Sequence, residues 1–296
     1  MPAASVRDLR RRIRSIGNTR KITRALELVA SARLRRAEAR IAAMRPYAER
    51  MRELTAGTAR AAASFQGLAL LQQREVRTVA IVAVTSDRGL AGSFNGQILR
   101  RAFALERDLR GQNAQVRWLV TGKKGRSTLR FRRYEIEQAW IDFTDRPTYH
   151  DAQAIAHKLE ELYTEEAIDG ASVIYNRYYS PLTQTVEVQE LLPISEDLLA
   201  AADDRDAAQT GDFIFEPEPE QILERLLPVY LETELYRALL ESAASEHGAR
   251  MTAMRNASKN AGELIDTLTL EMNRARQAEI TQEILEVVAG ADALTA

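Results

Sequence analysis

The sequence predicts an α/β protein in which a small Rossmann-like domain is inserted between two long terminal helices that pair as an antiparallel coiled coil. Two observations predict this fold. Apolar residues recur in steps of three and four near both ends of the 296-residue chain, which is the spacing of paired helices. Between them, β-branched runs alternate with helical segments, as in a mostly parallel sheet. We expect helices over 1–60 and 217–296, and the α/β domain over 75–212.

The N-terminal helix is predicted from residues 4–57, where the apolar period of about 3.5 is typical of a left-handed coiled coil. The predicted seam comprises Val6, Leu9, Ile13, Ile16, Ile22, Leu26, Val29, Leu34, Ala37, Ile41, Met44, Ala48 and Met51. It changes phase near 17–21 and again near 30–33. Pro46 should bend the helix, because its ring removes a backbone donor and crowds the preceding turn.

The central part is predicted to alternate strands and helices. Strands are expected at 76–85, 116–121, 135–142, 171–179 and 183–191, and helices at 95–110, 124–132 and 151–167. The first strand is a β-branched run, which is typical of a buried strand. The last two strands are separated by Ser180, Pro181 and Leu182, which favours a turn between them. Residues 195–212 are acidic and rich in alanine, and we expect a loop or linker there.

The C-terminal helix is predicted to begin near Pro217 and Pro219, with acids in its first turn that complement the helix dipole. Pro228 should kink or interrupt it. The predicted seam comprises Met254, Ala257, Ala261, Leu264, Leu268, Met272 and Ala275. The part after Pro228 would span roughly 100 Å, against roughly 80 Å for the N-terminal helix. Its last part is therefore expected to project alone or to enter another protein.

Charge is distributed unevenly, although the net charge is only −1. Residues 1–60 hold sixteen Arg or Lys against five acids, a net charge of +11, and residues 196–246 hold fourteen acids against three arginines, a net charge of −11. Such blocks indicate charged partners at two places, or else solvated helix faces. Nucleic acid is not the expected partner of the basic block, because no aromatic residue occurs before Tyr47 and the arginines surround the helix.

Composition and motifs exclude several other functions. The chain has no cysteine, which rules out disulfides and Cys-based metal or redox sites. No apolar run approaches a membrane span, and the Arg-rich N-terminus lacks the apolar core of a secretory signal. We expect a cytoplasmic protein. The three histidines, His150, His157 and His247, have no metal-ligand spacing.

Two glycine-containing loops, 85–95 and 122–127, stand where α/β domains bind phosphates. Neither loop has a phosphate-binding fingerprint, so we interpret both as structural turns. No nucleophile elbow marks a catalytic serine. We therefore expect no catalytic residue, no bound nucleotide, no metal and no other cofactor.

The final helix carries the most specific motif of the chain. Residues 280–293 read ITQEILEVVAGADA. Other characteristic stretches are NTRKIT at 18–23, SDRGL at 86–90, ASEH at 244–247, ARMTAM at 249–254 and NRARQA at 273–278. In their order and over essentially the full length, these stretches resemble gamma subunits of F-type ATP synthases.

The resemblance implies a non-catalytic central rotor. The paired terminal helices would form a shaft inside the ring of α and β subunits, and the α/β domain would meet the epsilon subunit and the membrane ring of c subunits. One copy per complex would turn within the head, coupling proton-driven rotation to ATP synthesis or hydrolysis at the β subunits and regulating ATPase activity. The protein would be peripheral on the cytoplasmic face of a bacterial cell membrane, because no transit peptide is evident.

The resemblance also implies residues that contact the stator. They are Arg276, Gln277, Thr281 and Glu283 near the C-terminus, and the basic residues Lys21, Arg33 and Arg36 on the N-terminal helix. The basic helix would face acidic lever segments of β, because opposite charges attract across a moving interface. Two other interpretations remain open, namely a coiled-coil scaffold or adaptor with an α/β head, and a nucleotide-binding switch that uses the 86–95 turn.

Overall fold

The structure is a computed structural model that describes residues 5–62, 64–65, 67–195 and 216–295. The chain divides into two compact units, residues 31–250 and residues 1–30 together with 251–296. Two long helices, α1 (Val6–Ala61) and α6 (Pro219–Thr295), contribute to both units. Of the loop predicted at 195–212, all but its first residue lies outside the described residues.

Residues 31–250 contain a five-stranded sheet of order β3-β2-β1-β4-β5. Its strands are β1 (Thr78–Val84), β2 (Gln115–Thr121), β3 (Ile136–Trp140), β4 (Gly170–Tyr178) and β5 (Gln184–Leu192). Neighbouring strands are parallel except β5, which is antiparallel to β4. All five predicted strands are confirmed, each to within two residues at either end. The predicted α/β fold with long terminal helices is therefore confirmed.

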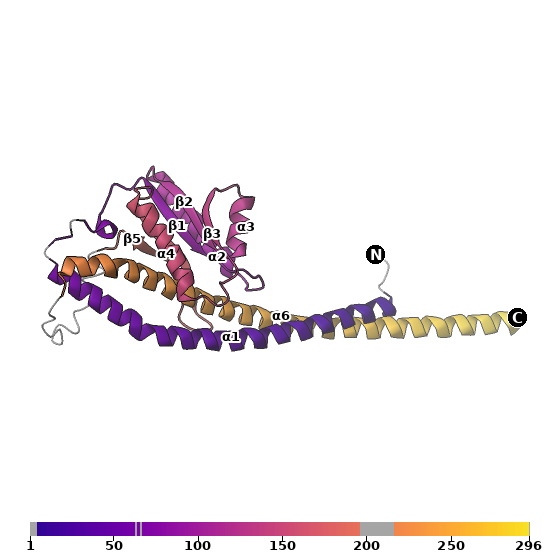
Figure 1. The fold of residues 1–296 in the computed structure, drawn as a ribbon. Helices are drawn as coiled ribbons and strands as arrows, with labels where there is room; N and C mark the ends of the chain where they lie inside the picture. The colour runs from indigo at the N-terminus through magenta and orange to yellow at the C-terminus, as the bar shows by residue number, and fades with distance from the viewer. Residues whose placement is uncertain (1–4, 63, 66, 196–215, 296) are drawn as a thin grey trace. The chain divides into compact units, whose positions relative to one another are not determined.

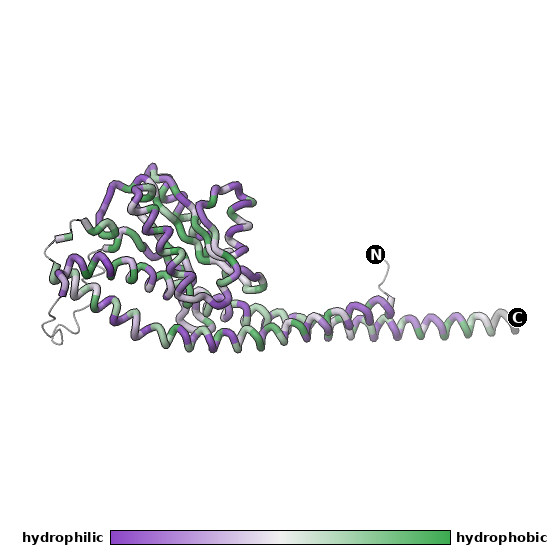
Figure 2. The backbone as a smooth tube through the Cα atoms, in the orientation of Figure 1, coloured by the Kyte–Doolittle hydropathy of each residue, from purple (hydrophilic) through white to green (hydrophobic). Residues whose placement is uncertain are grey.

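Helices cover both faces of this sheet (Figure 1). In β1, Ala80, Val82 and Val84 point to one face, where α4 (Tyr149–Thr164), α6 and the short helix η1 (Ala69–Leu71) pack. Ile81 and Ala83 point to the other face, against α2 (Phe94–Gly111) and α3 (Lys123–Phe131). Because side chains alternate along a strand, one apolar run can supply both cores. The green, hydrophobic residues of Figure 2 gather along these strands.

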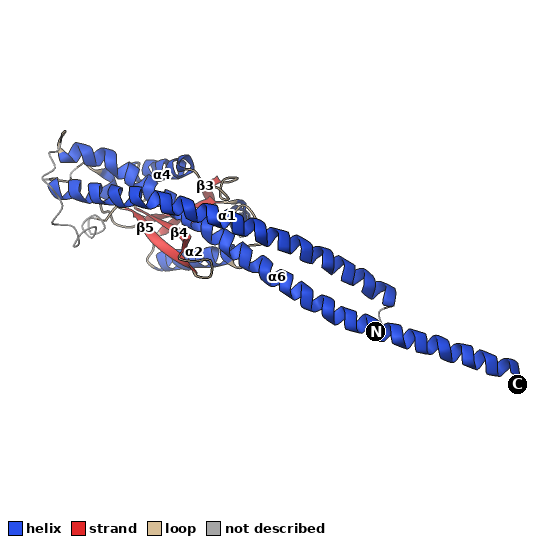
Figure 3. Ribbon diagram, turned by 90° about the horizontal axis from the view of Figure 1, so that it is seen from below, coloured by secondary structure: helices blue, strands red, loops and turns tan. Residues whose placement is uncertain are grey.

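Within residues 31–250, α1 and α6 run antiparallel and side by side (Figure 3). Arg52 on α1 meets Glu234 on α6 at 2.6 Å, and Glu38, further toward the start of α1, meets Tyr178 at the end of β4. Both helices continue without interruption through Pro46 and Pro228. A break at Pro228 was one of the two outcomes that the sequence predicted, and it does not occur.

Within the other unit, α1 and α6 are antiparallel as well. Glu27 Oε1 accepts a hydrogen bond from Arg255 Nε at 3.0 Å, and Arg20 lies over Gly262. Moving seven residues toward the start of α1 therefore corresponds to moving seven residues toward the end of α6. A Cβ at Gly262 would lie 3.4 Å from Arg20 Cζ, so the glycine allows the guanidinium to approach the helix backbone.

The seam of α1 keeps its phase where the sequence predicted two phase changes. The buried residues Thr23, Glu27 and Ala30 continue the steps of three and four, whereas Ile22 and Val29 are 60% and 49% exposed. The prediction followed the apolar side chains and was wrong for this stretch. Polar side chains can occupy the seam because Arg24 and Arg255 both bind the Glu27 carboxylate. Burial alone raises the pKa of Glu27, but hydrogen bonds from these arginines outweigh it and hold the pKa below its usual value.

The seam of α6 in the same unit also follows alternating steps of three and four. Its buried and half-buried members are Met251, Met254, Ser258, Ala261, Ile265, Leu268, Met272 and Ala275. The predicted member Leu264 is instead 47% exposed, and Ile265 takes the seam position beside it. This regular spacing is that of a left-handed two-helix coiled coil.

The last part of α6 extends beyond the start of α1 (Figure 3). Continuing the register that pairs Glu27 with Arg255 places Val6 opposite about Arg276. Every residue from 276 to 291 is exposed. The remaining stretch of α6 is roughly 28 Å long. This unpaired end, residues 276–295, is called the overhang below. The predicted excess of the C-terminal helix over its partner is thus present.

Candidate functional site

Four of the seven predicted contact residues lie on the overhang. Arg276, Gln277, Thr281 and Glu283 are all exposed. The Thr281 hydroxyl donates a hydrogen bond to the Gln277 carbonyl oxygen at 2.9 Å, which brings these two residues onto one face of the helix. None of the four forms a salt bridge with another described side chain. Their charged and amide groups are therefore available to another molecule.

The overhang also exposes apolar side chains. These are Ile280, Ile284, Leu285, Val287 and Val288, each between 47% and 72% exposed. In Figure 2 this part of α6 mixes hydrophobic and hydrophilic residues along its length. An unpaired helix of this kind leaves about half or more of each of these side chains in water, and exposed apolar surface that gathers in one place marks an interaction site. The geometry favours a partner that surrounds the overhang.

The three basic residues predicted on α1 differ in availability. Lys21 and Arg36 are exposed, and neither forms an ion pair with a described residue. Arg33 instead forms an ion pair with both carboxylate oxygens of Asp145, in the loop after β3. Its guanidinium is therefore already bound within residues 31–250, and it is less available for a partner than Lys21 or Arg36.

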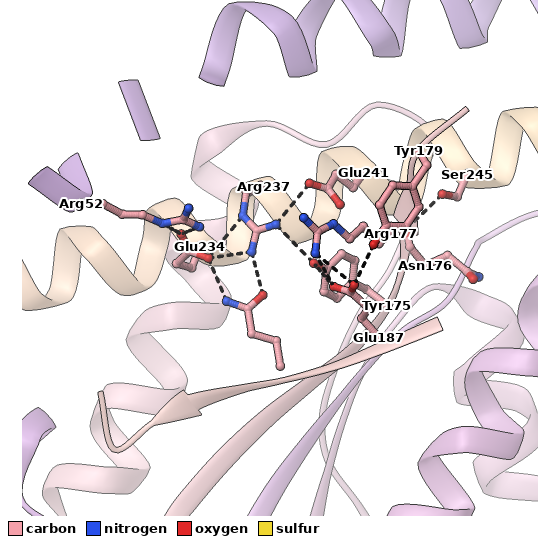
Figure 4. Close-up of polar contacts among 11 residues, drawn as sticks. Arg52, Tyr175, Asn176, Arg177, Tyr179, Glu187, Glu234, Arg237, Glu241 and Ser245 are labelled. Carbon is pink, nitrogen blue, oxygen red and sulfur yellow. Dashed lines mark hydrogen bonds and ion pairs between the residues drawn. The ribbon is translucent and has the colours of Figure 1, made fainter. Parts of the chain in front are cut away.

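An ionic cluster that the sequence did not predict lies within residues 31–250, where α6 meets α1 and the sheet (Figure 4). At its centre, Arg237 Nη2 is 2.7 Å from Glu234 Oε2. Arg52 on α1 binds the other Glu234 oxygen at 2.6 Å. Gln189 on β5 donates to Glu234 at 2.8 Å and accepts from Arg237 at 2.8 Å. Arg237 also meets Glu241 at 3.2 Å.

The cluster extends to β4. Arg237 donates to the Tyr175 hydroxyl at 3.3 Å, and that hydroxyl donates to Glu187 on β5 at 3.2 Å. Arg177 binds Glu187 at 3.0 Å. The cluster therefore joins α1, α6, β4 and β5. Because the buried charges of Glu234 and Arg237 at its centre are paired, the cluster holds these elements in one arrangement.

Electrostatics keep the centre of the cluster charged. Burial alone raises the pKa of Glu234, but Arg237 and Arg52 outweigh it and hold the pKa below its usual value. Burial alone lowers the pKa of Arg237, and Glu234 outweighs it and raises the pKa. The pKa of Glu241 is raised because burial dominates there. Burial also raises the pKa of Tyr175 to about 12, so its hydroxyl stays protonated and can donate.

The acidic block of the sequence contains the signal for this cluster. Glu234, Glu241 and Glu246 belong to the acidic block that the sequence assigned to partners or to solvated faces, yet they are 2%, 8% and 2% exposed. Glu234, Arg237 and Glu241 follow helical spacing, with buried Leu235 and Ala238 between them. Opposite charges at that spacing on an apolar helix face indicate a buried network.

A second buried group lies on α6 near the end of residues 31–250. Arg250 binds Glu246, and its Nη2 donates to the Gly89 carbonyl oxygen at 3.2 Å. His247 Nε2 is 3.3 Å from the Asp145 carbonyl oxygen. Burial raises the pKa of Glu246 to about 7, although the nearby charge of Arg250 lowers it in part. Burial lowers the pKa of His247 to about 4. Glu246 and His247 therefore titrate with opposite effects on stability.

These two shifts predict a pH dependence that single substitutions uncover. Glu246 favours the folded state below pH 4.5, and this contribution is lost as pH rises through about 7. His247 contributes stability above pH 6.5 that is lost as pH falls through about 4. As pH rises from 4.5 to 7, the free energy of unfolding of Glu246→Gln should increase relative to that of the wild type, because the variant lacks the group whose contribution is lost. As pH rises from 4 to 6.5, the free energy of unfolding of His247→Gln should decrease relative to that of the wild type, because the variant lacks the group whose contribution appears there.

The measurement is chemical unfolding of the full chain at several pH values, followed by the fluorescence of Trp118 and Trp140. Both tryptophans lie in the sheet. Parallel pH profiles for the wild type and both variants would contradict the assignment. A matched Gln variant of exposed His157 should leave the pH profile of the wild type unchanged.

The 85–95 and 122–127 loops, which stand where α/β domains bind phosphates, direct their backbone N–H groups into the protein. In the first loop, the Ser86 N–H donates to Asn95 Oδ1 and the Asp87 N–H donates to Thr144 Oγ1, both at 2.9 Å. In the second loop, the Lys123 N–H donates to Asp87 Oδ1 at 3.1 Å, and the Lys124 N–H donates to the Ser86 carbonyl oxygen at 3.0 Å. The Gly125 N–H donates to Thr85 Oγ1 at 2.8 Å. These N–H groups are the ones that a phosphate would need. In this structure they instead connect the ends of β1 and β2.

In the part of the chain that the structure describes, no group of three or more His, Cys, Asp or Glu side chains could hold a metal ion. Over the same residues, no helix combines the length and the apolar character needed to cross a membrane.

Comparisons with known proteins agree with the long helices and the inserted sheet. The sequence model of a family described as ATP synthase matches residues 5–294. A relative from Moorella thermoacetica named ATP synthase gamma chain is 47% identical, over 98% of this chain and 99% of its own length. A relative of the same name from Rubrobacter xylanophilus is 46% identical, over 99% of each chain.

Solved structures are similar as well. A chain from the central stalk and c-ring of the Tetrahymena thermophila mitochondrial ATP synthase is 27% identical, with a TM-score of 0.57 over 80% of this chain and 99% of that one. A chain from the Euglena gracilis mitochondrial ATP synthase has a TM-score of 0.69 over 98% of this chain and 94% of that one. At 18% identity, this second likeness shows the fold alone. The match to named relatives over nearly its whole length shows that the chain belongs to the ATP synthase gamma chain family.

Proposed function

We propose that this chain is the central rotor shaft of a proton-translocating F-type ATP synthase. It couples ion-driven rotation of the membrane c-ring to ATP synthesis and hydrolysis at the β subunits. The observation that carries this proposal is the overhang, which exposes five large apolar side chains together with Arg276, Gln277, Thr281 and Glu283. A helix end of this composition needs an enclosing partner, and the head of an ATP synthase supplies one.

A paired helix suits this task mechanically. Two helices wound together with regular heptad spacing resist bending and twisting better than one, because each side chain of the seam is held between side chains of the partner. The surface of such a shaft differs from face to face. As it turns, each β subunit meets a different face in succession, so equivalent catalytic sites are held in different states.

The partners follow from this assignment. The overhang and the basic start of α1 contact the α and β subunits, and the α/β domain contacts the epsilon subunit and the c-ring. Support comes from the Tetrahymena relative, which belongs to a central stalk with its c-ring. One copy is present per complex, and no nucleic acid takes part. We propose the functional segments as 1–60 and 217–296 for the shaft and 75–212 for the globular domain.

We propose that the chain is not itself catalytic and influences ATPase activity through its contacts with β. The backbone donors of the 86–95 and 122–127 loops bind the chain's own groups, which supports the expectation that no nucleotide binds there. We place the protein on the cytoplasmic face of a bacterial cell membrane, as a peripheral subunit. Its high identity to chains from two bacteria supports this location.

Replacing Gln277 or Thr281 with Ala should weaken coupling several-fold while the chain still folds and assembles. Both side chains are exposed, and substitutions at such positions change stability by no more than about 0.5 kcal/mol. The measurement is ATP-driven proton pumping, divided by ATP hydrolysis, in membranes that contain the assembled complex.

The matched control is Gln221→Ala, at an exposed glutamine of α6 within residues 31–250. It should leave the ratio of pumping to hydrolysis at the wild-type value. If Gln277→Ala and Thr281→Ala also retain that value, these two residues do not mediate the contact.

A further inference from the structure

A small cavity of about 270 Å³ lies within residues 31–250, bounded by α1, the loop after β3 and α6. Its most unusual property is its lining of arginines. Four of them face it, Arg33, Arg36 and Arg40 from α1 and Arg146 from the loop. The other lining residues are Ala37, Asp145, Pro147, Leu240, Ala243 and His247.

The charges around the cavity do not balance. Arg33 and Asp145 form an ion pair, so their charges offset each other. Burial lowers the pKa of His247 to about 4, so its ring is neutral near pH 7. Arg36, Arg40 and Arg146 form no ion pair with any residue in the described part of the chain. Three positive charges therefore share one cavity without an internal counter-charge.

The backbone holds these three arginines at one place. Arg36 and Arg40 are one helical turn apart and so lie on the same face of α1. Ala37 beside them is small and buried, which lets the loop approach the helix. Arg146 is fixed between a turn, in which its N–H donates to the Phe143 carbonyl oxygen at 2.9 Å, and buried Pro147.

We propose that this cavity binds a phosphate-class oxyanion. Like charges held close together repel one another, and an anion between them removes that repulsion. Guanidinium groups present planar pairs of donors that match the oxygens of phosphate bidentately. A tetrahedral anion has enough oxygens to meet three such groups, which reach the cavity from two separate elements.

The size of the cavity also favours a small anion. Its volume lies below the roughly 300–1,000 Å³ of sites that enclose a drug-sized ligand. A carboxylate offers only two oxygens in one plane, whereas the three arginines approach from α1 and from the loop. A single carboxylate would therefore leave one guanidinium without a partner. The oxyanion can come from free phosphate, from pyrophosphate or from a lipid headgroup, and all three present the same chemistry.

The test is isothermal titration of the purified full chain with inorganic phosphate and with pyrophosphate, at constant ionic strength set by chloride. We expect saturable binding of one anion per chain. Arg36→Gln, Arg40→Gln and Arg146→Gln should each weaken it about tenfold. Arg35→Gln is the matched control, because Arg35 is exposed on α1 and does not line the cavity. It should bind like the wild type.

Two further arms complete the test. Vesicles that contain phosphatidic acid, compared with phosphatidylcholine alone, identify a headgroup source if they bind the wild type and not the three variants. Arg146→Lys keeps the charge and loses the planar donor pair, so it should bind more weakly than wild type while keeping the fold. Absence of saturable binding by phosphate, pyrophosphate and vesicles would overturn the proposal. Equal weakening by Arg35→Gln would overturn it too.

Discussion

Arg237→Met will lower the free energy of unfolding of this chain by about 3–5 kcal/mol, because it leaves Glu234 buried after the loss of one of its two arginine partners. Glu234 is 2% exposed and Arg237 binds it at 2.7 Å. The same change removes one hydrogen bond from each of Gln189 and Tyr175 and takes the arginine partner from buried Glu241. Chemical unfolding followed by the fluorescence of the two tryptophans measures the loss.

Two variants make this result specific. Arg225→Met, at an exposed position of the same helix, should change stability by no more than about 0.5 kcal/mol. Glu234→Leu combined with Arg237→Met should recover part of the stability, because the Glu234 carboxylate is then no longer buried without Arg237, although Glu241 still lacks that partner. A double variant as unstable as Arg237→Met alone would show that the buried charge is not the cause.

Gly122→Ala is the second change with a large expected effect, a loss of about 3 kcal/mol. Gly122 has a φ of +84°, a conformation that disfavours any residue with a Cβ. An added Cβ would collide with the Thr85 carbonyl oxygen and lie 2.6 Å from the Ser86 carbonyl carbon. Both are backbone atoms at the end of β1, so the loop between β2 and α3 would have to move. The readout is the same fluorescence-detected unfolding.

The comparison is Gly96→Ala on α2. Gly96 is exposed, and an added Cβ there would meet nothing within 4 Å. Alanine favours the helix over glycine by about 1 kcal/mol, so this variant should be as stable as wild type or slightly more. Equal stability of Gly96→Ala and Gly122→Ala would contradict the close packing of Gly122 against the backbone of Thr85 and Ser86.

Elements with strong local signals were predictable from the sequence. The buried strand β1 is marked by β-branched residues without interruption, and α2 by helical spacing, so both lie within two residues of the prediction. The overhang was predictable from length alone, since α6 has more residues after its last proline than α1 can pair with. These features depend on residues close together in the chain.

Features that depend on distant residues were not predictable. Ile22 would be a good seam residue by composition, yet Thr23 and Glu27 take the seam because Arg255 from the other end of the chain binds Glu27. The ionic cluster depends in the same way on Arg52, Gln189 and Glu234 meeting across long stretches of sequence. Likewise, the pairing of Arg33 with Asp145 makes one of the predicted stator contacts less available than the sequence indicated.

The central claim is that this chain turns as a single shaft inside a catalytic head, and counting subunits in the native complex tests it most directly. Affinity purification through a tag on the chain, followed by mass measurement of the intact complex, should give one copy of the chain with α, β and epsilon subunits and the c-ring. Recovery of the chain without α and β subunits, or in a number equal to theirs, would contradict the assignment.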